Sequence, residues 1–379
     1  MKFLSKKAMT GLLVGATTLS IWAPASEAAP ANNQYYSINL QANQNLVWDV
    51  SGSLELPGRP IKNKDIILSN ANNNDNQQFA FFPLDDGRYA IVNKNSGKSA
   101  IGFDEALLDV SWDGSPAQQW YLRDKGSNNY EIVNQGNGKV ASYGKLYTPI
   151  PASIQEIVDL DDSNPSDPDR VFYIGNSLSS FELPTLPATG NRPDAPNYTG
   201  SVDQQLPQTS NSVVVGASLI PCIMVKDSQA SDYTKIHNSP YYTLVKEEYW
   251  DKTFSAVIPA GITRTYSFKT GMTSVDQQKM TDTLSMKIGA DFGLKYGDST
   301  ASLKSEISRT IQTEITSTDT EASEETVNST VTSEPGKTTG FTEYQLATKY
   351  TLKRADGSIV SDPWIVKNNK ITVARKNAQ

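Results

Sequence analysis

Cysteine and histidine are almost absent from this chain, which has one of each in 379 residues. Because Cys222 stands alone, no internal disulfide can stabilise the fold, and we expect its side chain to be buried as a small hydrophobe. A lone His237 excludes zinc sites built on paired histidines and leaves at most one Ser-His-Asp or Cys-His arrangement. No Gly-x-Ser-x-Gly motif accompanies it. We therefore predict no enzymatic activity, no metal and no cofactor.

Basic residues are fewer than acidic ones, 34 Lys and Arg against 41 Asp and Glu, and three lysines cluster at the N-terminus. Three lysines there precede an apolar run from Ala8 to Trp22, and Ser26-Glu27-Ala28 has the small residues of a cleavage site. This pattern predicts a secretory signal peptide over residues 1–28; the alternative, a membrane anchor, suits the short and interrupted run less well. Removing three Lys and one Glu with it changes the net charge from -7 to -9. Such an acidic chain argues against a nucleic-acid partner.

A phrase of about fifteen residues occurs twice, as YAIVNKNSGKSAIG from Tyr89 and YEIVNQGNGKVASYG from Tyr130. The motifs QQF at Gln77 and QQW at Gln118 are spaced by the same forty-one residues. A fainter copy precedes them, and RVFYIG from Arg170 resembles a third, degenerate ending. Short apolar runs separated by Asn, Gly, Asp and Pro predict strands and turns throughout residues 29–175. A repeat of this length indicates one copied supersecondary unit that buries a core only together with its copies.

Three copies of about forty residues that end in Gln-x-aromatic resemble the ricin-B type β-trefoil, a carbohydrate-binding fold. In that family an early Asp and an Asn just before the Gln bind sugar hydroxyls, and an aromatic ring stacks on the sugar. Only the first copy has this set, and the resemblance assigns carbohydrate binding to Trp48, Asp49, Asn76 and Gln77. The alternative is that Asp49 and Asn76 only cap turns.

Composition changes beyond the repeats. Residues 176–212 are rich in Pro, Ser, Thr, Asn and Gln, which predicts an extended linker that is exposed and weakly structured. Residues 213–379 contain long stretches of alternating polarity rich in Ser and Thr, which predict long, half-exposed strands. We also expect the tail after Lys367 to be weakly structured. The whole chain is thus predicted to be all-β, with a trefoil joined by a Pro-rich linker to an elongated sheet domain.

Two segments of the C-terminal part carry a more specific resemblance. SLIPCIMVKD from Ser218 and SPYYTLVKEEYWDK from Ser239 are similar to the Bin-like (toxin-10) family of insecticidal toxins. This resemblance implies an aerolysin-type pore-forming domain behind the trefoil. It further implies a homo-oligomeric pore, an insect midgut membrane as target, and a surface glycan or glycosylated receptor. Whether a second toxin component joins, and whether the protein is secreted or deposited as a parasporal crystal, stays open.

The segment TLSMKIGADFGLKYG, from Thr283 to Gly297, alternates strictly between apolar and polar residues. After GDST (297–300), a second run continues to Ile311. Two membrane-spanning strands of about 9 to 11 residues around a turn would form an insertable hairpin over residues 283–311. The residues predicted to insert share the apolar face: Leu284, Met286, Ile288, Ala290, Phe292, Leu294, Tyr296, Leu303 and Ile307.

Two alternatives to this hairpin remain from the residues themselves. One is a strand half-buried in a soluble sheet, and the other is a helix that uses the four-residue spacing from Leu303 to Ile315. For the whole chain, the leading hypothesis is a pore-forming toxin. A secreted carbohydrate-binding module without pore formation is the runner-up, and a glycosidase with a lectin appendage is the third possibility.

Overall fold

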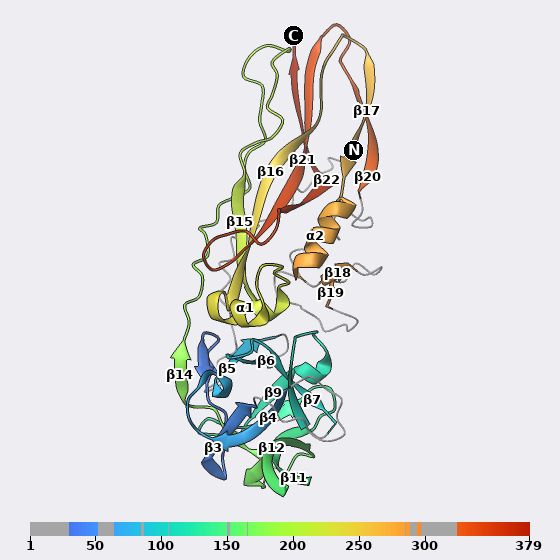
Figure 1. The fold of residues 1–379 in the computed structure, drawn as a ribbon. Helices are drawn as coiled ribbons and strands as arrows, with labels where there is room; N and C mark the ends of the chain where they lie inside the picture. Colours follow the sequence, from blue (N-terminus) through green and yellow to red (C-terminus); the bar gives the residue numbers. More distant parts are fainter. Residues whose placement is uncertain are drawn as a thin grey trace, which may run out of the picture.

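The computed structural model describes residues 30–51, 64–84, 87–104, 106–149, 152–164, 166–284, 286–288, 294–296 and 324–379. Strands dominate these residues, so the predicted all-β class is confirmed. Figure 1 shows an elongated molecule with short strands packed together at one end and long strands that extend away from them. The predicted signal peptide lies outside the described residues.

The N-terminal part is a network of short strands in the order β11-β10-β13-β2-β3-β4-β12-β8-β7-β6-β5-β1-β14, with β9 joining β10 to β6. Neighbouring strands are antiparallel throughout the register, and the core they enclose is aromatic and aliphatic. The strands are β1 (Gln34–Tyr36), β2 (Asn39–Leu40), β3 (Asn43–Val50), β4 (Lys64–Asn70), β5 (Phe79–Pro83), β6 (Arg88–Asn93), β7 (Ser99–Phe103), β8 (Ala106–Val110), β9 (Trp120–Asp124), β10 (Asn129–Asn134), β11 (Val140–Pro149), β12 (Ala152–Asp161), β13 (Phe172–Tyr173) and β14 (Ser177–Ser180).

Three short 3-10 helices mark the predicted three copies. They are η1 (Asp75–Gln77), η3 (Pro116–Gln118) and η4 (Pro168–Arg170). Each helix is followed by one intervening residue and then by a strand that begins with a fully buried aromatic residue: Phe79, Trp120 and Phe172. The degenerate third ending at Arg170 is therefore a true copy, and the trefoil prediction is confirmed.

The hydrogen bonds of the Gln side chains explain why the chain repeats them. Gln77 donates from Nε2 to the Asn70 carbonyl (3.0 Å), and Gln118 donates to the Ser111 carbonyl (2.9 Å). Each Gln also accepts the backbone N–H five residues before it, at 2.7 and 2.8 Å. Both Gln side chains are buried, and these bonds satisfy their polar atoms.

The repeated phrase also supplies side chains that bond the backbone, on strands β6 and β10. Asn93 and Asn134 each donate from the side-chain amide to the middle carbonyl of the preceding 3-10 helix, at 2.9 and 2.8 Å. The turns that follow contain Gly97 at φ 69° and Gly138 at φ 74°. Glycine is favoured at both positions because side chains disfavour the left-handed region. The phrase therefore encodes a tight turn and a cross-link, not a binding motif.

The C-terminal part is built on a four-stranded antiparallel sheet in the order β15-β16-β21-β22. Its two central strands pair along most of their length, from Thr243↔Lys353 to Ile258↔Thr339. Two smaller antiparallel pairs accompany it, β17–β20 and β18–β19. No helix in the described part of the chain is long and apolar enough to cross a membrane. The elements are β15 (Val213–Pro221), η5 (Cys222–Met224), α1 (Asp232–Asn238), β16 (Tyr241–Ile258), β17 (Thr263–Thr270), α2 (Ser274–Leu284), β18 (Met286–Ile288), β19 (Leu294–Tyr296), β20 (Glu325–Thr332), β21 (Thr339–Lys353) and β22 (Trp364–Ala378).

The predicted linker contains β14, and its remainder, residues 181–212, runs as an extended strap along the sheet domain (Figure 1). The expectation that it is weakly structured is wrong. Leu206 is 3% exposed in a cluster with Trp250 and Tyr344. The Trp250 indole donates to the Pro193 carbonyl (2.7 Å), and the Tyr344 hydroxyl donates to a second proline carbonyl (2.7 Å). Proline-rich composition thus gives an extended chain whose carbonyls are bonded by the sheet's aromatic residues.

The prediction for the C-terminal tail is also wrong. Residues after Lys367 belong to β22, which pairs with β21 up to Ala378↔Thr339. A bulge shifts the register between Gln345 and Leu346, and beyond it every second residue of β22 is exposed. Its polar composition reflects this half-exposed position at the edge of the sheet, where basic residues protect the strand from unwanted pairing.

One continuous hydrophobic cluster joins the trefoil to the sheet domain. The trefoil contributes Tyr35 and Phe82, and the sheet domain contributes Tyr241 and the buried CIMV segment, residues 222–225. The rings of Phe82 and Tyr241 meet edge to face at 5.2 Å, and the Tyr35 hydroxyl donates to the Ile236 carbonyl (3.0 Å). The sequence motif that carries the family resemblance therefore builds the contact between the two domains.

Candidate functional site

Three of the four residues predicted to bind carbohydrate lie together. Asp49 is on β3, and both of its carboxylate oxygens accept hydrogen bonds from η1: Asn76 Nδ2 donates to Oδ1 (2.6 Å) and Gln77 Nε2 donates to Oδ2 (2.7 Å). Asp49 is 6% exposed, whereas Asn76 is half-buried. Because these bonds join a strand to a helix twenty-seven residues away, Asp49 does not cap a local turn. The arrangement fixes a carboxylate and an amide at a polar cluster whose remaining lone pairs and N–H groups could meet hydroxyl groups.

Trp48 does not belong to this cluster. Its side chain is fully buried and meets Phe79 and Phe172 edge to face at 5.9 and 5.7 Å. Alternation along β3 explains the difference, since neighbouring residues of a strand point to opposite faces. Asp49 points to the polar side, so Trp48 points into the core. The prediction that Trp48 stacks on a sugar is therefore contradicted by its burial.

In the second and third copies, other side chains occupy the position that Asp49 has in the first copy. A side chain at Gly102 would meet the Asn134 amide at 2.8 Å, so Asn134 occupies this place in the second copy. In the third copy, Ser142 stands twenty-eight residues before Arg170, as Asp49 does before Gln77. Ser142 and Arg170 both bond Asp161, at 2.9 and 3.2 Å. Sequence analysis missed this third set, because the second copy does not keep the spacing: Gly102 stands only sixteen residues before Gln118.

A second candidate site is the ribbon of β17 and β20, which pair over eight positions from Thr263↔Thr332 to Thr270↔Glu325. One face is fully exposed and carries only hydroxyl, amide and ammonium side chains. The other face packs on the sheet, where Tyr266 stacks on Phe254 at 4.1 Å and 9°. The exposed face consists of Thr263, Thr265, Ser267, Lys269, Thr326, Asn328, Thr330 and Thr332.

The chain that leaves this ribbon, residues 271–324, contains the predicted membrane hairpin. The structure differs from the predicted uninterrupted strand, because Thr283 and Leu284 end helix α2. Leu284 is fully buried at a four-residue spacing from Met280, which satisfies a helix as well as a strand. Beyond it, β18 pairs with β19 antiparallel, with Met286↔Tyr296 and Ile288↔Leu294 opposite each other. The predicted residues Ala290, Phe292, Leu303 and Ile307 lie outside the described residues.

A bidentate ion pair in the sheet domain ties the family motif to the turn that follows β21. Arg354 binds both carboxylate oxygens of Asp227, at 2.6 and 2.7 Å, and the Tyr242 hydroxyl donates to the same group (3.1 Å). Burial, the largest single influence, would raise the pKa of Asp227, but the hydrogen bonds from Arg354, the Gln229 backbone N–H and Tyr242, together with the Arg354 charge, outweigh it and hold that pKa below its usual range. The Asp227 side chain is fully buried, so this pair locks the loop before α1 onto the sheet.

The two rare residues have structural positions. Cys222 is buried in the interdomain cluster, and burial raises the pKa of its thiol to about 12. His237 ends helix α1, where Nδ1 lies 2.8 Å from the Tyr233 carbonyl and Nε2 lies 3.7 Å from Asp75 of the trefoil. Among the described residues, no three His, Cys, Asp or Glu side chains are placed to hold a metal ion.

Comparison with known proteins supports both domains. Residues 213–376 match the family described as "Insecticidal Crystal Toxin, P42", and residues 21–106 match the family described as "Ricin-type beta-trefoil lectin domain-like". The described fold resembles the crystal structure of Cry35Ab1 with a TM-score of 0.73, at 21% identity over 92% of this chain and 90% of that one. At this identity the likeness concerns the fold alone.

Two curated relatives come from Lysinibacillus sphaericus. The binary larvicide subunit BinA is 31% identical over 85% of this chain and 86% of its own length. The binary larvicide subunit BinB is 27% identical over 81% of this chain and 70% of its own length. The similarity to BinA thus spans both domains and the strap between them.

Proposed function

This chain belongs to the Bin-like (toxin-10) family of insecticidal toxins, and from that premise we propose that it is itself an insecticidal toxin that forms membrane pores. In this proposal the trefoil binds a glycan or glycosylated receptor on an insect midgut cell. Several copies then assemble into a ring, and residues 283–311 of each insert as a β-hairpin. The protein acts by permeabilising the membrane and carries out no chemical reaction.

The observation that carries the proposal is the β17–β20 ribbon. Its two strands are already paired, and the chain between them contains the strictly alternating segment from Thr283 to Gly297. A strand that spans a membrane as part of a pore needs one apolar and one polar face, and its extension outside the bilayer needs polar surface. The exposed hydroxyl-rich face of the ribbon supplies such surface on the two strands that flank the chain containing the alternating segment.

The proposed receptor function rests on the Asp49 cluster. A carboxylate held by two amides is well suited to accept hydrogen bonds from neighbouring sugar hydroxyls, since its position is fixed before the ligand arrives. The second copy is filled by Asn134, and the third uses its Arg170 on Asp161. We therefore assign the sugar contact to the first copy, through Asp49, Asn76 and Gln77.

The proposal extends to where the protein acts and with what. Residues 1–28 would direct secretion, with deposition in a parasporal crystal as the alternative route out of the cell. Two relatives are named as subunits of a binary larvicide, which motivates a second toxin component as a further partner. A homo-oligomer is the simpler assembly and is tested first.

The direct test adds the purified chain, before and after mild protease treatment, to dye-loaded liposomes made with and without insect midgut glycolipids. The proposal predicts dye release together with a membrane-bound oligomer that survives sedimentation. If the chain binds the glycolipid vesicles and releases no dye, even with a homologous second subunit present, it is a carbohydrate-binding protein without pore formation. That alternative is the one favoured by the Asp49 cluster taken alone.

A further inference from the structure

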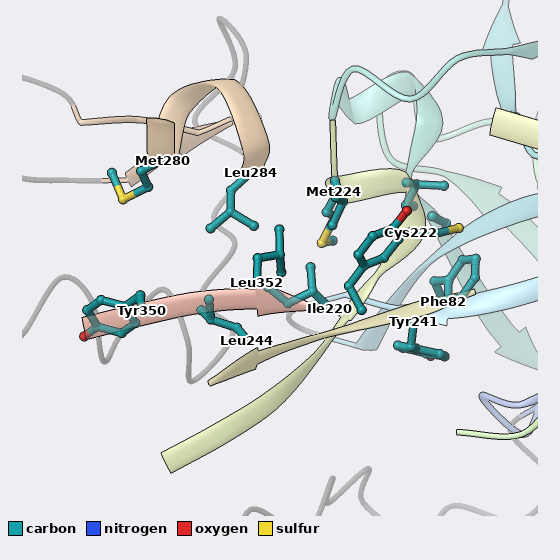
Figure 2. Close-up of a cluster of buried hydrophobic side chains, with 14 of the residues drawn as sticks. Phe82, Ile220, Cys222, Met224, Tyr241, Leu244, Met280, Leu284, Tyr350 and Leu352 are labelled. Carbon is teal, nitrogen blue, oxygen red and sulfur yellow. The ribbon is translucent and has the colours of Figure 1, made fainter. Parts of the chain in front are cut away.

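Helix α2 joins the ribbon to the segment that is proposed to insert, and a small number of side chains hold it in place. Met280 and Leu284 are fully buried in the interdomain cluster, together with Met272 just before the helix. Figure 2 shows Leu284 pointing from α2 toward Leu352 of β21, with Ile220 close by. The helix thereby rests on the same cluster that joins the two domains.

The helix has little stability of its own. It has eleven residues, a length at which isolated helices are marginal in water. Val275 is 62% exposed, and Thr283 uses its hydroxyl to bond the Lys279 carbonyl (2.7 Å), a contact that weakens helices slightly. Its C-terminal end is secured from outside, because the Lys226 backbone N–H donates to the Thr283 carbonyl (2.8 Å). Docking on the cluster, and not local propensity, therefore maintains α2.

The buried apolar residues of α2 also fit a strand. Tyr266 and Phe268 lie on the sheet-facing side of β17, and both positions are even-numbered. Met272, Met280 and Leu284 are even-numbered as well, and the alternation continues in the sequence into β18. In a strand, residues two apart share a face, so one continuous strand from β17 would keep all of them on one side.

A single glycine interrupts β17 before the helix. Gly271 has φ 84° and exchanges two backbone hydrogen bonds with Lys367 of β22, at 2.9 and 3.0 Å. This left-handed residue turns the chain away from the direction of the ribbon. Glycine can also adopt extended dihedrals without strain, so releasing the Lys367 bonds would allow the strand to continue.

From these observations we infer that α2 is a retaining clip that converts from helix to strand when the pore forms. In the soluble protein the docked helix fixes the chain at the point where the inserting segment begins. On release, residues 272–284 become extended and lengthen β17 toward the membrane. Ser274, Asp276 and Asp282 would then lie on the even-numbered face, which places residues 272–282 outside the hydrocarbon, just before the inserting segment begins. The inference rests on the proposed function and adds to it the identity of the switching element.

The test is a cysteine scan across residues 272–284 with a nitroxide label, read by solvent accessibility in the soluble protein and in the membrane-bound oligomer. The native thiol of Cys222 is fully buried, so the unmodified chain serves as the unlabelled control. The soluble protein should show the helical period of about 3.6 residues, and the oligomer should show a period of two. A helical period retained in the oligomer, or uniform exposure, would overturn the inference.

A matched pair of substitutions at one exposed site gives a kinetic test. Gln278 is exposed and donates only to Asp282 of the same helix (2.7 Å) among the contacts described. Gln278→Ala favours the helix and Gln278→Val favours a strand, so the rate of dye release should differ about threefold between them, with Val the faster. Equal rates would contradict the inference. If the unmodified chain releases no dye, the proposed function fails instead, so the two failures are distinguishable.

Discussion

The trefoil and the sheet domain are stabilised by different kinds of interaction. In the trefoil the same hydrogen bonds recur at a fixed spacing: those of Gln77 and Gln118 tie each copy internally, and those of Asn93 and Asn134 tie a copy to the one before it. In the sheet domain, long strands form a stable base, and helix α2 rests on it mainly through a few apolar side chains. Redundant polar bonds suit a domain that stays folded. A few hydrophobic contacts suit an element that must leave.

The largest effect is expected in the sheet domain, at the segment proposed to meet lipid. Ile288→Lys would place a charge against hydrocarbon, which costs about 2 to 4 kcal/mol for each copy near the bilayer centre. We expect this variant to fold and oligomerise but to lose dye release from liposomes. Lys287→Ser changes the neighbouring position of opposite parity and is the control. Equal loss in both variants would mean that the two parities do not face different environments.

Removing the Arg354 guanidinium tests whether the base of the sheet domain is as firm as the comparison requires. Arg354→Met leaves the buried Asp227 carboxylate without its cation, which should lower the free energy of unfolding by about 3 to 5 kcal/mol in urea titrations. Exposed Arg264→Met should change it by less than about 0.5 kcal/mol. A small effect at both sites would show that the Asp227 contact is unimportant for the base.

The same pair predicts the response to acid. Because the folded pKa of Asp227 lies below its unfolded value of about 3.9, its contribution to stability is complete above that pH and is lost as the pH falls through the folded pKa. Between pH 5 and 2 the unmodified protein should therefore lose more stability than Arg354→Met does. Parallel curves for the two proteins would contradict this assignment.

A smaller effect is expected in the trefoil. Asn76→Ala removes the half-exposed amide of the Asp49 cluster without emptying the core, and Asp49→Ala removes the acceptor. Loss of a hydrogen bond to a charged group costs about 1.5 to 3 kcal/mol, so glycan-array binding should weaken about ten- to a hundredfold. Ser142→Ala at the matching place of the third copy should leave binding intact. If the double variant of Asp49 and Asn76 still binds, recognition lies elsewhere.

The smallest effect is expected in the strap, which is held both by hydrogen bonds and by an apolar cluster. Tyr344→Phe deletes only the hydroxyl that bonds a strap carbonyl, a loss of about 0.5 to 1.5 kcal/mol. Local opening of residues 181–212 should become several times more frequent, seen as faster cleavage there by proteinase K. Exposed Tyr233→Phe is the control. Rapid cleavage of the unmodified strap would show that its contacts do not protect it.

The parts of the fold that could be predicted are those encoded by repeated sequence segments. The forty-one-residue period identifies the trefoil because the repeated Gln and Asn side chains each perform the same bond. Trp48 could not be placed, since alternation shows that it opposes Asp49 without showing which face is the core. The strap was misjudged because its bonds use proline carbonyls, which composition does not reveal as partners.

The switching region could not be resolved from the sequence for a different reason. Leu284 and Met280 satisfy a helix by their four-residue spacing and a strand by their even parity. Only the cluster beneath them, contributed by residues such as Leu352 that are distant in sequence, decides which conformation the soluble protein adopts. The spacing of these residues fits both a helix and a strand, and we infer that the segment adopts both, a helix in the soluble protein and a strand in the pore.

Single-channel recording in planar bilayers tests the pore most directly. Lys287 and Lys295 lie opposite each other in the β18–β19 register and have the parity proposed to face water. The unmodified chain should give discrete conductance steps, and the double variant Lys287→Glu, Lys295→Glu should give steps whose reversal potential shifts toward cation selectivity. An unchanged reversal potential would contradict the hairpin, and a membrane-bound oligomer without any steps would contradict the pore itself.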